Sequence, residues 1–270
     1  MAKLRLETTN AVSRTLLIPL WARALEQRER HPILVDPVAA AVIDAIDYDW
    51  NGIRLARGDL VQMVVRAREF DRFVRDFLSR HPGACVVQLG AGLDSRFQRV
   101  DDGSVRWFDL DLPEVVALRR RLIPESERSR CLAASVTEPQ WMEDVVRPAD
   151  SPILFVAEAL LPYLEAGQVR ELVVRLLKTF PGSELVTDMC TPLALRIDNL
   201  HLLVVGSRAR MHWSERDPHD VEAWGPGIRL AESFGYFEDP EPRMGLPSWF
   251  RRVPWLRRAT TIQRYVLGSS

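Results

Sequence analysis

The sequence predicts an α/β fold in which helices cover both faces of a mainly parallel sheet. From residue 84 onward, short apolar runs typical of strands alternate with helical patterns, as in sheets built from repeated strand–helix units. The first run ends in a Gly-Ala-Gly turn at 90–92, and glycines there let the backbone approach a ligand closely. We expect strands at 85–89, 105–109, 130–134, 152–157 and 183–189, with helices near 113–123 and 166–180.

The residues before this region predict helices and no strand. Apolar positions recur at helical spacing over 11–29, which ends before His31-Pro32. Asp36 followed by Pro37 is typical of a helix N-cap and first turn, opening a helix to about residue 46. A longer amphipathic helix is expected over 59–80.

After residue 190 the pattern predicts a long helical stretch over 192–212 and then a final pair of strands. The first strand of the pair follows the Trp-Gly-Pro-Gly sequence at 224–227, and residues 262–267 close the chain as an edge or inserted strand. We expect one domain, with a helical cap (1–82), a cofactor-binding core (83–190) and a substrate-side part (191–270).

Composition excludes several classes of protein. Of the 270 residues, 47% are hydrophobic and the formal net charge is −1, so nothing indicates disorder or a nucleic-acid partner. No apolar run reaches the about 18 residues of a membrane span, and no signal peptide is evident. The cysteines Cys85, Cys131 and Cys190 are far apart and in apolar contexts, as in reduced cytoplasmic proteins.

The glycine turn suggests a nucleotide-type cofactor but not a dinucleotide. Ser95 stands where the dinucleotide fingerprint needs its third glycine, the one that allows close packing under a pyrophosphate. Asp109 and Asp111 lie about 20 residues beyond the turn, where an acid suits ribose hydroxyls. A nucleoside cofactor without a pyrophosphate, such as S-adenosylmethionine, is therefore favoured.

The sequence resembles the class I S-adenosylmethionine-dependent methyltransferases of the leucine carboxyl methyltransferase family, and within it the bacterial branch of tetracenomycin-type polyketide O-methyltransferases. The matching stretches follow one another along nearly the whole chain: TLLIPL at 15–20, DP at 36–37, LGAGLDSR at 89–96, DLDLP at 109–113, RR at 119–120, SVTEPQW at 135–141, AEALLPYL at 157–164, FPGS at 180–183 and AWGPG at 223–227. The resemblance implies a Rossmann-like methyltransferase fold with an N-terminal helical extension and a helical insertion in its C-terminal part.

The resemblance also implies roles for individual residues. Arg66 would pair with the methionine carboxylate of the cofactor, a suitable task for a bidentate guanidinium. Gly90 would contact the cofactor through its backbone, Asp111 would hold the ribose hydroxyls, and Ser135 and Val136 would contact the adenine.

The assignments leave alternatives at four positions. Arg68 is close enough to Arg66 in sequence to be confused with it, and Asp109 has a second interpretation as a strand-end cap. Glu158 ends an apolar run and needs a partner if buried; by resemblance this is the amino group or sulfonium of the cofactor. Tyr163 is either a wall of the methyl-transfer site or a core residue.

Methyl transfer from a sulfonium is an in-line displacement, so the protein mainly aligns and desolvates two reactants. A carboxylate acceptor is ionised near pH 7 and needs no base, whereas a phenol or alcohol benefits from one. His201 and His212 are the candidate bases, each with an alternative role as a surface or packed residue. Arg208 and Arg210 could attract an acidic substrate. No spacing of ligands indicates a metal site.

The sequence thus predicts an S-adenosylmethionine-dependent O-methyltransferase acting on a carboxyl or hydroxyl group of a small, polyketide-like molecule. Two alternatives are a protein C-terminal carboxyl methyltransferase and a cofactor-binding homologue with altered chemistry. The N-terminal helices and the region around Trp224 favour an enclosed pocket, which suits a small molecule better than a chain terminus.

Overall fold

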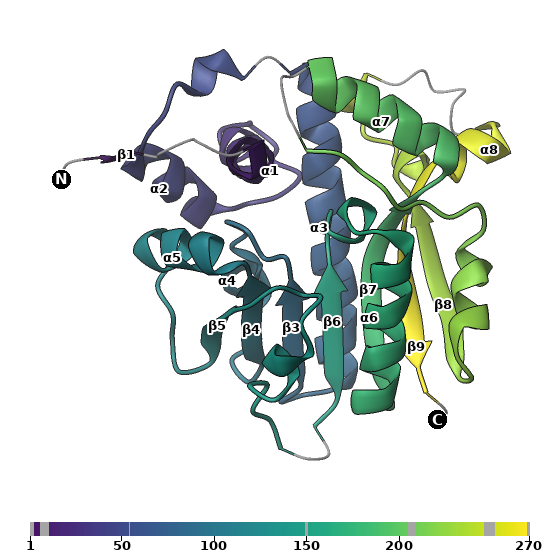
Figure 1. The fold of residues 1–270 in the computed structure, drawn as a ribbon. Coiled ribbons are helices and arrows are strands. Elements are labelled where there is room, and N and C mark those ends of the chain that lie inside the picture. Colours follow the sequence, from purple (N-terminus) through teal and green to yellow (C-terminus); the bar gives the residue numbers. More distant parts are fainter. Residues whose placement is uncertain are drawn as a thin grey trace.

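The computed structural model describes residues 3–5, 11–53, 55–148, 151–204, 209–245 and 252–268. Its centre is a seven-stranded sheet in the order β5-β4-β3-β6-β7-β9-β8 (Figure 1). The strands are β3 (Cys85–Leu89), β4 (Arg106–Asp111), β5 (Ser129–Ala133), β6 (Ile153–Ala157), β7 (Ser183–Cys190), β8 (Ile228–Gly235) and β9 (Thr260–Leu267). The first five in spatial order are parallel, and β9 is antiparallel to both β7 and β8.

Helices cover both faces of this sheet. The α-helices are α1 (Ala11–Glu26), α2 (Pro37–Ala45), α3 (Arg57–Arg80), α4 (Arg96–Val100), α5 (Pro113–Leu122), α6 (Ala166–Thr179), α7 (Pro192–Val204) and α8 (Pro254–Arg257). The 3-10 turns are η1 (Trp50–Gly52), η2 (Pro139–Met142), η3 (Leu161–Tyr163), η4 (Pro218–Trp224), η5 (Tyr236–Glu238) and η6 (Pro242–Met244). In Figure 1, α3 runs behind the sheet and α6 in front of it.

The two faces have separate apolar cores, which follow from the residues of the covering helices. On α3, Phe70, Phe73 and Phe77 are buried at helical spacing and pack with sheet residues such as Val86 and Trp107. Burying one such side chain stabilises the fold by about 1.5–3 kcal/mol. Because every residue of β3 and β6 is buried, these central strands carry no polar face, as expected for parallel strands covered on both sides.

The α1–α2 region and α7 lie beyond the carboxyl ends of the parallel strands (Figure 1). Asp36 caps α2 by accepting a hydrogen bond from the Ala39 amide at 2.9 Å, as predicted. Arg23 of α1 donates to the Leu93 carbonyl at 3.0 Å. The cap is thereby tied to the chain segment directly after the glycine turn.

The predicted fold class is confirmed, and the five predicted central strands agree with the observed ones to within two residues. Residues 262–267 belong to β9, which is inserted between β7 and β8. Two expectations were wrong. The N-terminal region contains two short parallel strands, β1 (Leu4–Arg5) and β2 (Ile46–Asp47), a pair too short for a sequence pattern to indicate.

The second wrong expectation is the helix over 192–212, since α7 ends at Val204 and residues 209–212 are not helical. The side chain of Asn199 explains the change of direction. Its amide oxygen accepts from the Met211 amide at 2.8 Å, and its amide nitrogen donates to the Met211 carbonyl at 2.9 Å. These bonds fasten residue 211 against the helix instead of continuing it. Arg208 lies outside the described residues.

Candidate active site

The candidate site lies where the carboxyl ends of β3, β4 and β6 meet. β3 is flanked by β4 on one side and by β6 on the other, so the chain reverses its strand order at this point. Ligands of open α/β sheets bind in the crevice at such a switch point. Three of the residues that the sequence predicted for the site lie at these strand ends: Gly90 after β3, Asp111 at the end of β4 and Glu158 after β6.

Gly90 and Gly92 shape the loop after β3. Both adopt left-handed backbone conformations, with φ of 65° and 53°, which other residues adopt only at a cost. A Cβ on Gly90 would lie 2.9 Å from the Leu160 side chain, and one on Gly92 would lie 2.8 Å from Leu16 of α1. Leu160, which follows β6, and Leu16 of the N-terminal cap therefore pack directly against the glycine backbone, which leaves no room for a side chain at either position.

Asp111, at the end of β4, faces this turn. Its carboxylate accepts from the Gly92 amide at 2.7 Å and from the Leu112 amide at 2.7 Å. Burial raises the pKa of Asp111, and these two amides offset part of that effect. The acid and the glycine turn thus form one local unit at the edge of the crevice.

Asp109 has a structural role. Its carboxylate accepts from Arg119 at 2.6 Å and from the indole of Trp107 at 2.8 Å, and it is 2% exposed. Arg119 of α5 also donates to the carbonyls of Gly92 and Asp94 at 3.0 and 2.6 Å. The buried Asp109–Arg119 pair therefore holds the backbone of the glycine turn in place. Asp111 is the remaining acid of the two, and it faces the crevice.

Ser135 and Val136 follow β5. The Ser135 hydroxyl lies 2.8 Å from that of Thr137, and Val136 is buried with its carbonyl accepting from the Trp141 indole at 3.3 Å. The Ala134 amide donates to the Asp111 carbonyl at 3.0 Å. The loops after β4 and β5 are therefore adjacent, as the predicted roles require.

Arg66 and Glu158, 92 residues apart in sequence, form a partly buried ion pair. Nε of Arg66 donates to Oε1 of Glu158 at 2.8 Å, and their side chains are 15% and 10% exposed. Arg96 donates to the second carboxylate oxygen. Burial alone would raise the pKa of Glu158, but the two guanidinium groups hold it below its ordinary value. Glu158 therefore has the protein's own arginines as partners and is ionised.

Arg96 was not assigned a role from the sequence. It is fully buried, and besides Glu158 it pairs with Asp71 at 2.8 Å and Asp94 at 3.1 Å. These pairs continue toward the N-terminal cap, because Arg99 contacts Asp71, Asp94 and Asp36, and Arg23 contacts Asp36. We call this set the buried ion network: Arg23, Asp36, Arg66, Asp71, Asp94, Arg96, Arg99 and Glu158.

Asp188, the other side chain that sequence reasoning missed, lies at the carboxyl end of β7. Its Oδ2 is 3.9 Å from Nη1 of Arg66 and accepts from the Tyr236 hydroxyl at 3.2 Å. Burial raises the pKa of Asp188 to about 6, in spite of the nearby Arg66. The signal available was the one used for Glu158, namely an acid at the end of an apolar strand run.

Arg68 does not lie with Arg66. It pairs with Glu69 at 2.7 Å and with Asp239, whereas Arg66 contacts the acids at the carboxyl ends of β6 and β7. The geometry thus separates two arginines that the sequence left interchangeable, and Arg66 is the one in the crevice.

The three candidate catalytic residues differ in burial and in their neighbours. Tyr163 belongs to η3, and burial raises its pKa to about 12, with Arg66 among the neighbouring charges. His201 lies on α7, 3.8 Å from Asp59 of α3, and His212 lies 3.0 Å from Glu165. Both imidazoles are more than a third exposed, whereas Tyr163 is near the charge of Arg66.

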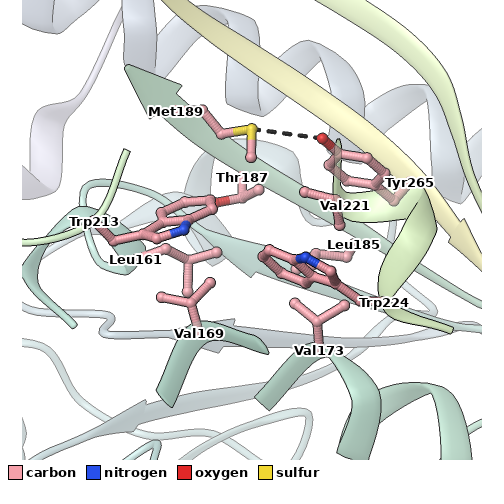
Figure 2. Close-up of a pocket in the computed structure, with 10 residues that line it drawn as sticks. All are labelled: Leu161, Val169, Val173, Leu185, Thr187, Met189, Trp213, Val221, Trp224 and Tyr265. Carbon is pink, nitrogen blue, oxygen red and sulfur yellow. Dashed lines mark hydrogen bonds between the residues drawn. The ribbon is translucent and has the colours of Figure 1, made fainter. Parts of the chain in front are cut away.

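A narrow apolar gap lies between α6 and the strands β7 and β9 (Figure 2). It has no room for a water molecule, and the Tyr265 hydroxyl bonds to the Met189 sulfur across it at 3.5 Å. Trp224 lines this gap and packs against Trp213 with the two rings tilted and their centroids 6.1 Å apart. Trp224 is therefore part of the apolar layer under α6, which does not support its expected role in enclosing the acceptor.

Three further findings on the described residues concern other kinds of site. No group of three or more His, Cys, Asp and Glu side chains among them could hold a metal ion. None of the described helices is long and apolar enough to cross a membrane. Cys85, Cys131 and Cys190 are buried free thiols, and burial raises the pKa of each of them.

Comparison with known proteins agrees with this geometry. Residues 17–177 match the family model described as leucine carboxyl methyltransferase. The chain is 36% identical over 261 residues to the tetracenomycin polyketide synthesis O-methyltransferase TcmP of Streptomyces glaucescens, covering 94% of this chain and 96% of that protein. It is 30% identical to an S-adenosyl-L-methionine-dependent methyltransferase of Gibberella zeae, covering 90% and 88% of the two chains.

Solved structures support the same fold at lower sequence identity. A putative methyltransferase from Thermobifida fusca superposes with a TM-score of 0.60 at 16% identity, covering 92% of this chain and 94% of that one. A DUF574 family protein from Streptomyces avermitilis gives a TM-score of 0.59 at 15% identity, covering 93% and 96%. Since the family match spans most of the chain and the relatives nearly all of it, the chain belongs to the leucine carboxyl methyltransferase family and is an S-adenosylmethionine-dependent methyltransferase.

Proposed function

We propose that the enzyme forms a methyl ester on a carboxylate of a small, polyketide-like molecule. The observation that carries the cofactor part of the proposal is the Arg66–Glu158 pair, together with the Asp111 carboxylate bonded to the glycine turn. A guanidinium and a carboxylate 2.8 Å apart offer complementary partners to the two charged groups of an amino acid.

The residues present fit the cofactor at separate points. Glu158 would bind the ammonium of its methionine part, Arg66 the carboxylate, and Asp111 the ribose hydroxyls. Gly90 would contact the cofactor through its backbone, and Ser135 and Val136 would contact the adenine, since their loop adjoins Asp111. No metal is needed for any of these contacts.

The choice of a carboxylate acceptor rests on the candidate bases. A phenol or alcohol gains from a base whose pKa lies near the working pH. Tyr163 has its pKa raised to about 12 by burial, which keeps it protonated at pH 7. His201 and His212 are more than a third exposed and lie near Asp59 and Glu165, respectively. A carboxylate is already ionised and requires none of these groups as a base.

Bound S-adenosylmethionine supplies an electrophilic methyl group on a sulfonium. Arg66 and Glu158 would hold its amino-acid end so that the acceptor oxygen and the methyl carbon are aligned. Methyl transfer to a carboxylate would form the oxygen–carbon bond as the carbon–sulfur bond breaks, so that an anion and a cation would give a neutral ester and a neutral thioether. The mutual loss of charge is favoured where the surrounding side chains exclude water.

The relatives support a small acceptor. TcmP is named for polyketide synthesis and O-methylation, and the family description names a carboxyl group.

We also propose a division of tasks along the chain, with residues 1–82 as a cap, 83–190 as the cofactor core and 191–270 as the acceptor side.

Methyl-labelled S-adenosylmethionine, incubated with the enzyme and an extract of its source cells, tests the proposal. We expect a labelled small molecule that releases labelled methanol in mild alkali, because esters hydrolyse there and aryl or alkyl methyl ethers do not. Label that resists alkali would identify a hydroxyl acceptor. Label in protein bands would instead identify a protein carboxyl methyltransferase, and the absence of any label would indicate altered chemistry.

A further inference from the structure

The turn directly after Glu158 contains a strained residue. Ala159 has φ of 51°, and among the described residues it is the single non-glycine residue with positive φ. A Cβ makes this left-handed conformation unfavourable for alanine. Such strain persists only where surrounding groups hold it, and it gathers at functional sites.

The group that holds Ala159 is Asp188 of β7, 29 residues away. Its Oδ1 accepts from the Ala159 amide at 2.8 Å, and its Oδ2 accepts from the Tyr236 hydroxyl at 3.2 Å. Asp188 is 5% exposed and Tyr236 is 4% exposed. The carboxylate is thus fixed by one donor on the Glu158 turn and by another on the segment that follows β8.

We infer that Asp188 is a positioning residue for the cofactor's amino-acid end, holding the strained Glu158–Ala159 turn through its hydrogen bond to the Ala159 amide. The direction of the Glu158 side chain depends on the backbone of that turn. If Ala159 relaxed toward negative φ, the Glu158 carboxylate would move away from Arg66 and from the ammonium it is proposed to bind. This inference rests on the proposed contacts of Arg66 and Glu158 with the cofactor.

The hydrogen bond and the charge of Asp188 are separable by substitution. Asp188→Asn keeps an oxygen that can accept from the Ala159 amide but removes the charge, whereas Asp188→Ala removes both. Ala159→Gly removes the strain itself, because glycine adopts positive φ freely. If Asp188 acts by holding the turn, Ala159→Gly should restore the binding that Asp188→Ala loses. If Asp188 acts through its charge or through general packing, Ala159→Gly should restore nothing.

Calorimetric binding of S-adenosylhomocysteine to the purified enzyme is the measurement, with thermal unfolding as a check that each variant is folded. We expect Asp188→Ala to weaken binding about tenfold, from the loss of a hydrogen bond to a buried charged group. Asp188→Asn should stay within about threefold of wild type. Adding Ala159→Gly to Asp188→Ala should recover about fivefold, the factor that corresponds to relieving a left-handed alanine.

Tyr236→Phe is the matched control, because it removes one donor to Asp188 and leaves the bond to Ala159 in place; binding should change by less than about threefold. Three results would overturn the inference: Asp188→Ala binding within twofold of wild type, Asp188→Asn as weak as Asp188→Ala, or no rescue by Ala159→Gly in a folded double variant. The acceptor takes no part in this experiment, so a wrong acceptor assignment leaves its outcome unchanged. An unchanged affinity in Arg66→Ala would instead show that the proposed cofactor contacts are wrong.

Discussion

The two sides of the candidate cofactor site are built from different kinds of interaction. On the side proposed to bind the nucleoside, at the ends of β4 and β5, polar groups bond to nearby backbone and hydroxyl groups. Asp111 accepts from the Gly92 amide, and Ser135 contacts Thr137. On the amino-acid side, Arg66, Arg96 and Glu158 come from three separate elements and meet as ions with little exposure.

This difference predicts how each side responds to substitution. A group bonded to neighbouring backbone can be removed with little effect on the rest of the fold, so its loss affects mainly the ligand. A buried ion is stable only while its partners neutralise it, so its removal leaves other charges buried and unpaired. Substitutions on the amino-acid side should therefore lower both ligand affinity and the free energy of unfolding. Substitutions on the nucleoside side should lower mainly ligand affinity.

Arg96→Met should have the largest effect, on stability. It leaves the carboxylates of Asp71 and Glu158 each with one guanidinium fewer in a buried setting. Removing one partner of a buried ion pair costs about 3–5 kcal/mol. Urea unfolding measures the change. Arg57→Met is the control, because Arg57 forms an exposed pair with Glu29, and it should change stability by less than about 1 kcal/mol. Equal effects of the two substitutions would contradict the comparison.

Arg66→Ala should weaken binding of S-adenosylhomocysteine by about 10- to 100-fold, the range for a charge-assisted hydrogen bond to a buried partner. Adenosine lacks the amino-acid part, so its affinity should change by less than twofold. Calorimetry with the two ligands separates these cases. Arg66→Lys keeps the charge without the bidentate geometry and should fall between wild type and Arg66→Ala. Equal losses for both ligands would mean that Arg66 acts on the whole site.

The same difference decides how far the sequence could predict the site. The glycine turn and Asp111 belong to short motifs, and the predicted strands put them at one edge of the sheet, so local pattern was sufficient. Glu158 could be recognised as a buried acid in need of a partner. Its observed partners, Arg66 and Arg96, lie 92 and 62 residues away in sequence, and no local pattern joins them.

Other outcomes follow from tertiary contacts of the same kind. Asp188 and Tyr236 are paired across 48 residues, which periodicity cannot reveal. The predicted helix over 192–212 failed because one side chain, Asn199, bonds both backbone groups of Met211. Helical propensity describes the preference of a segment in isolation. It does not include a side-chain bond that forms only when the chain has folded back on itself, as it does between Asn199 and Met211.

Asp111→Ala tests the nucleoside side directly. Loss of the carboxylate proposed to bind the ribose hydroxyls should weaken both S-adenosylhomocysteine and adenosine by about tenfold. Stability should fall by no more than about 1–2 kcal/mol, less than for Arg96→Met, because the carboxylate accepts, among the described residues, only from the neutral amides of Gly92 and Leu112. Glu114→Ala, an exposed acid three residues away, is the control and should leave both affinities unchanged. A change within twofold for Asp111→Ala would show that the ribose assignment is wrong.

The smallest expected effect concerns pH and again distinguishes the two sides. Asp188, close to Arg66, Glu158 and Tyr236, has its pKa raised to about 6 by burial. With the cofactor bound by the proposed contacts of Arg66 and Glu158, the Asp188 carboxylate, ionised at higher pH, would attract the sulfonium; as pH falls through about 6 it becomes neutral and that attraction would be lost. S-adenosylmethionine carries one positive charge more than S-adenosylhomocysteine, so its relative affinity should fall by about two- to fivefold between pH 7.5 and pH 5. Asp188→Asn should make this ratio independent of pH, while adenosine binding to the wild type should stay constant over the range. A ratio that is constant in the wild type would mean that Asp188 does not sense the charge of the cofactor, and the acidic character of the amino-acid side would then rest on Glu158 alone.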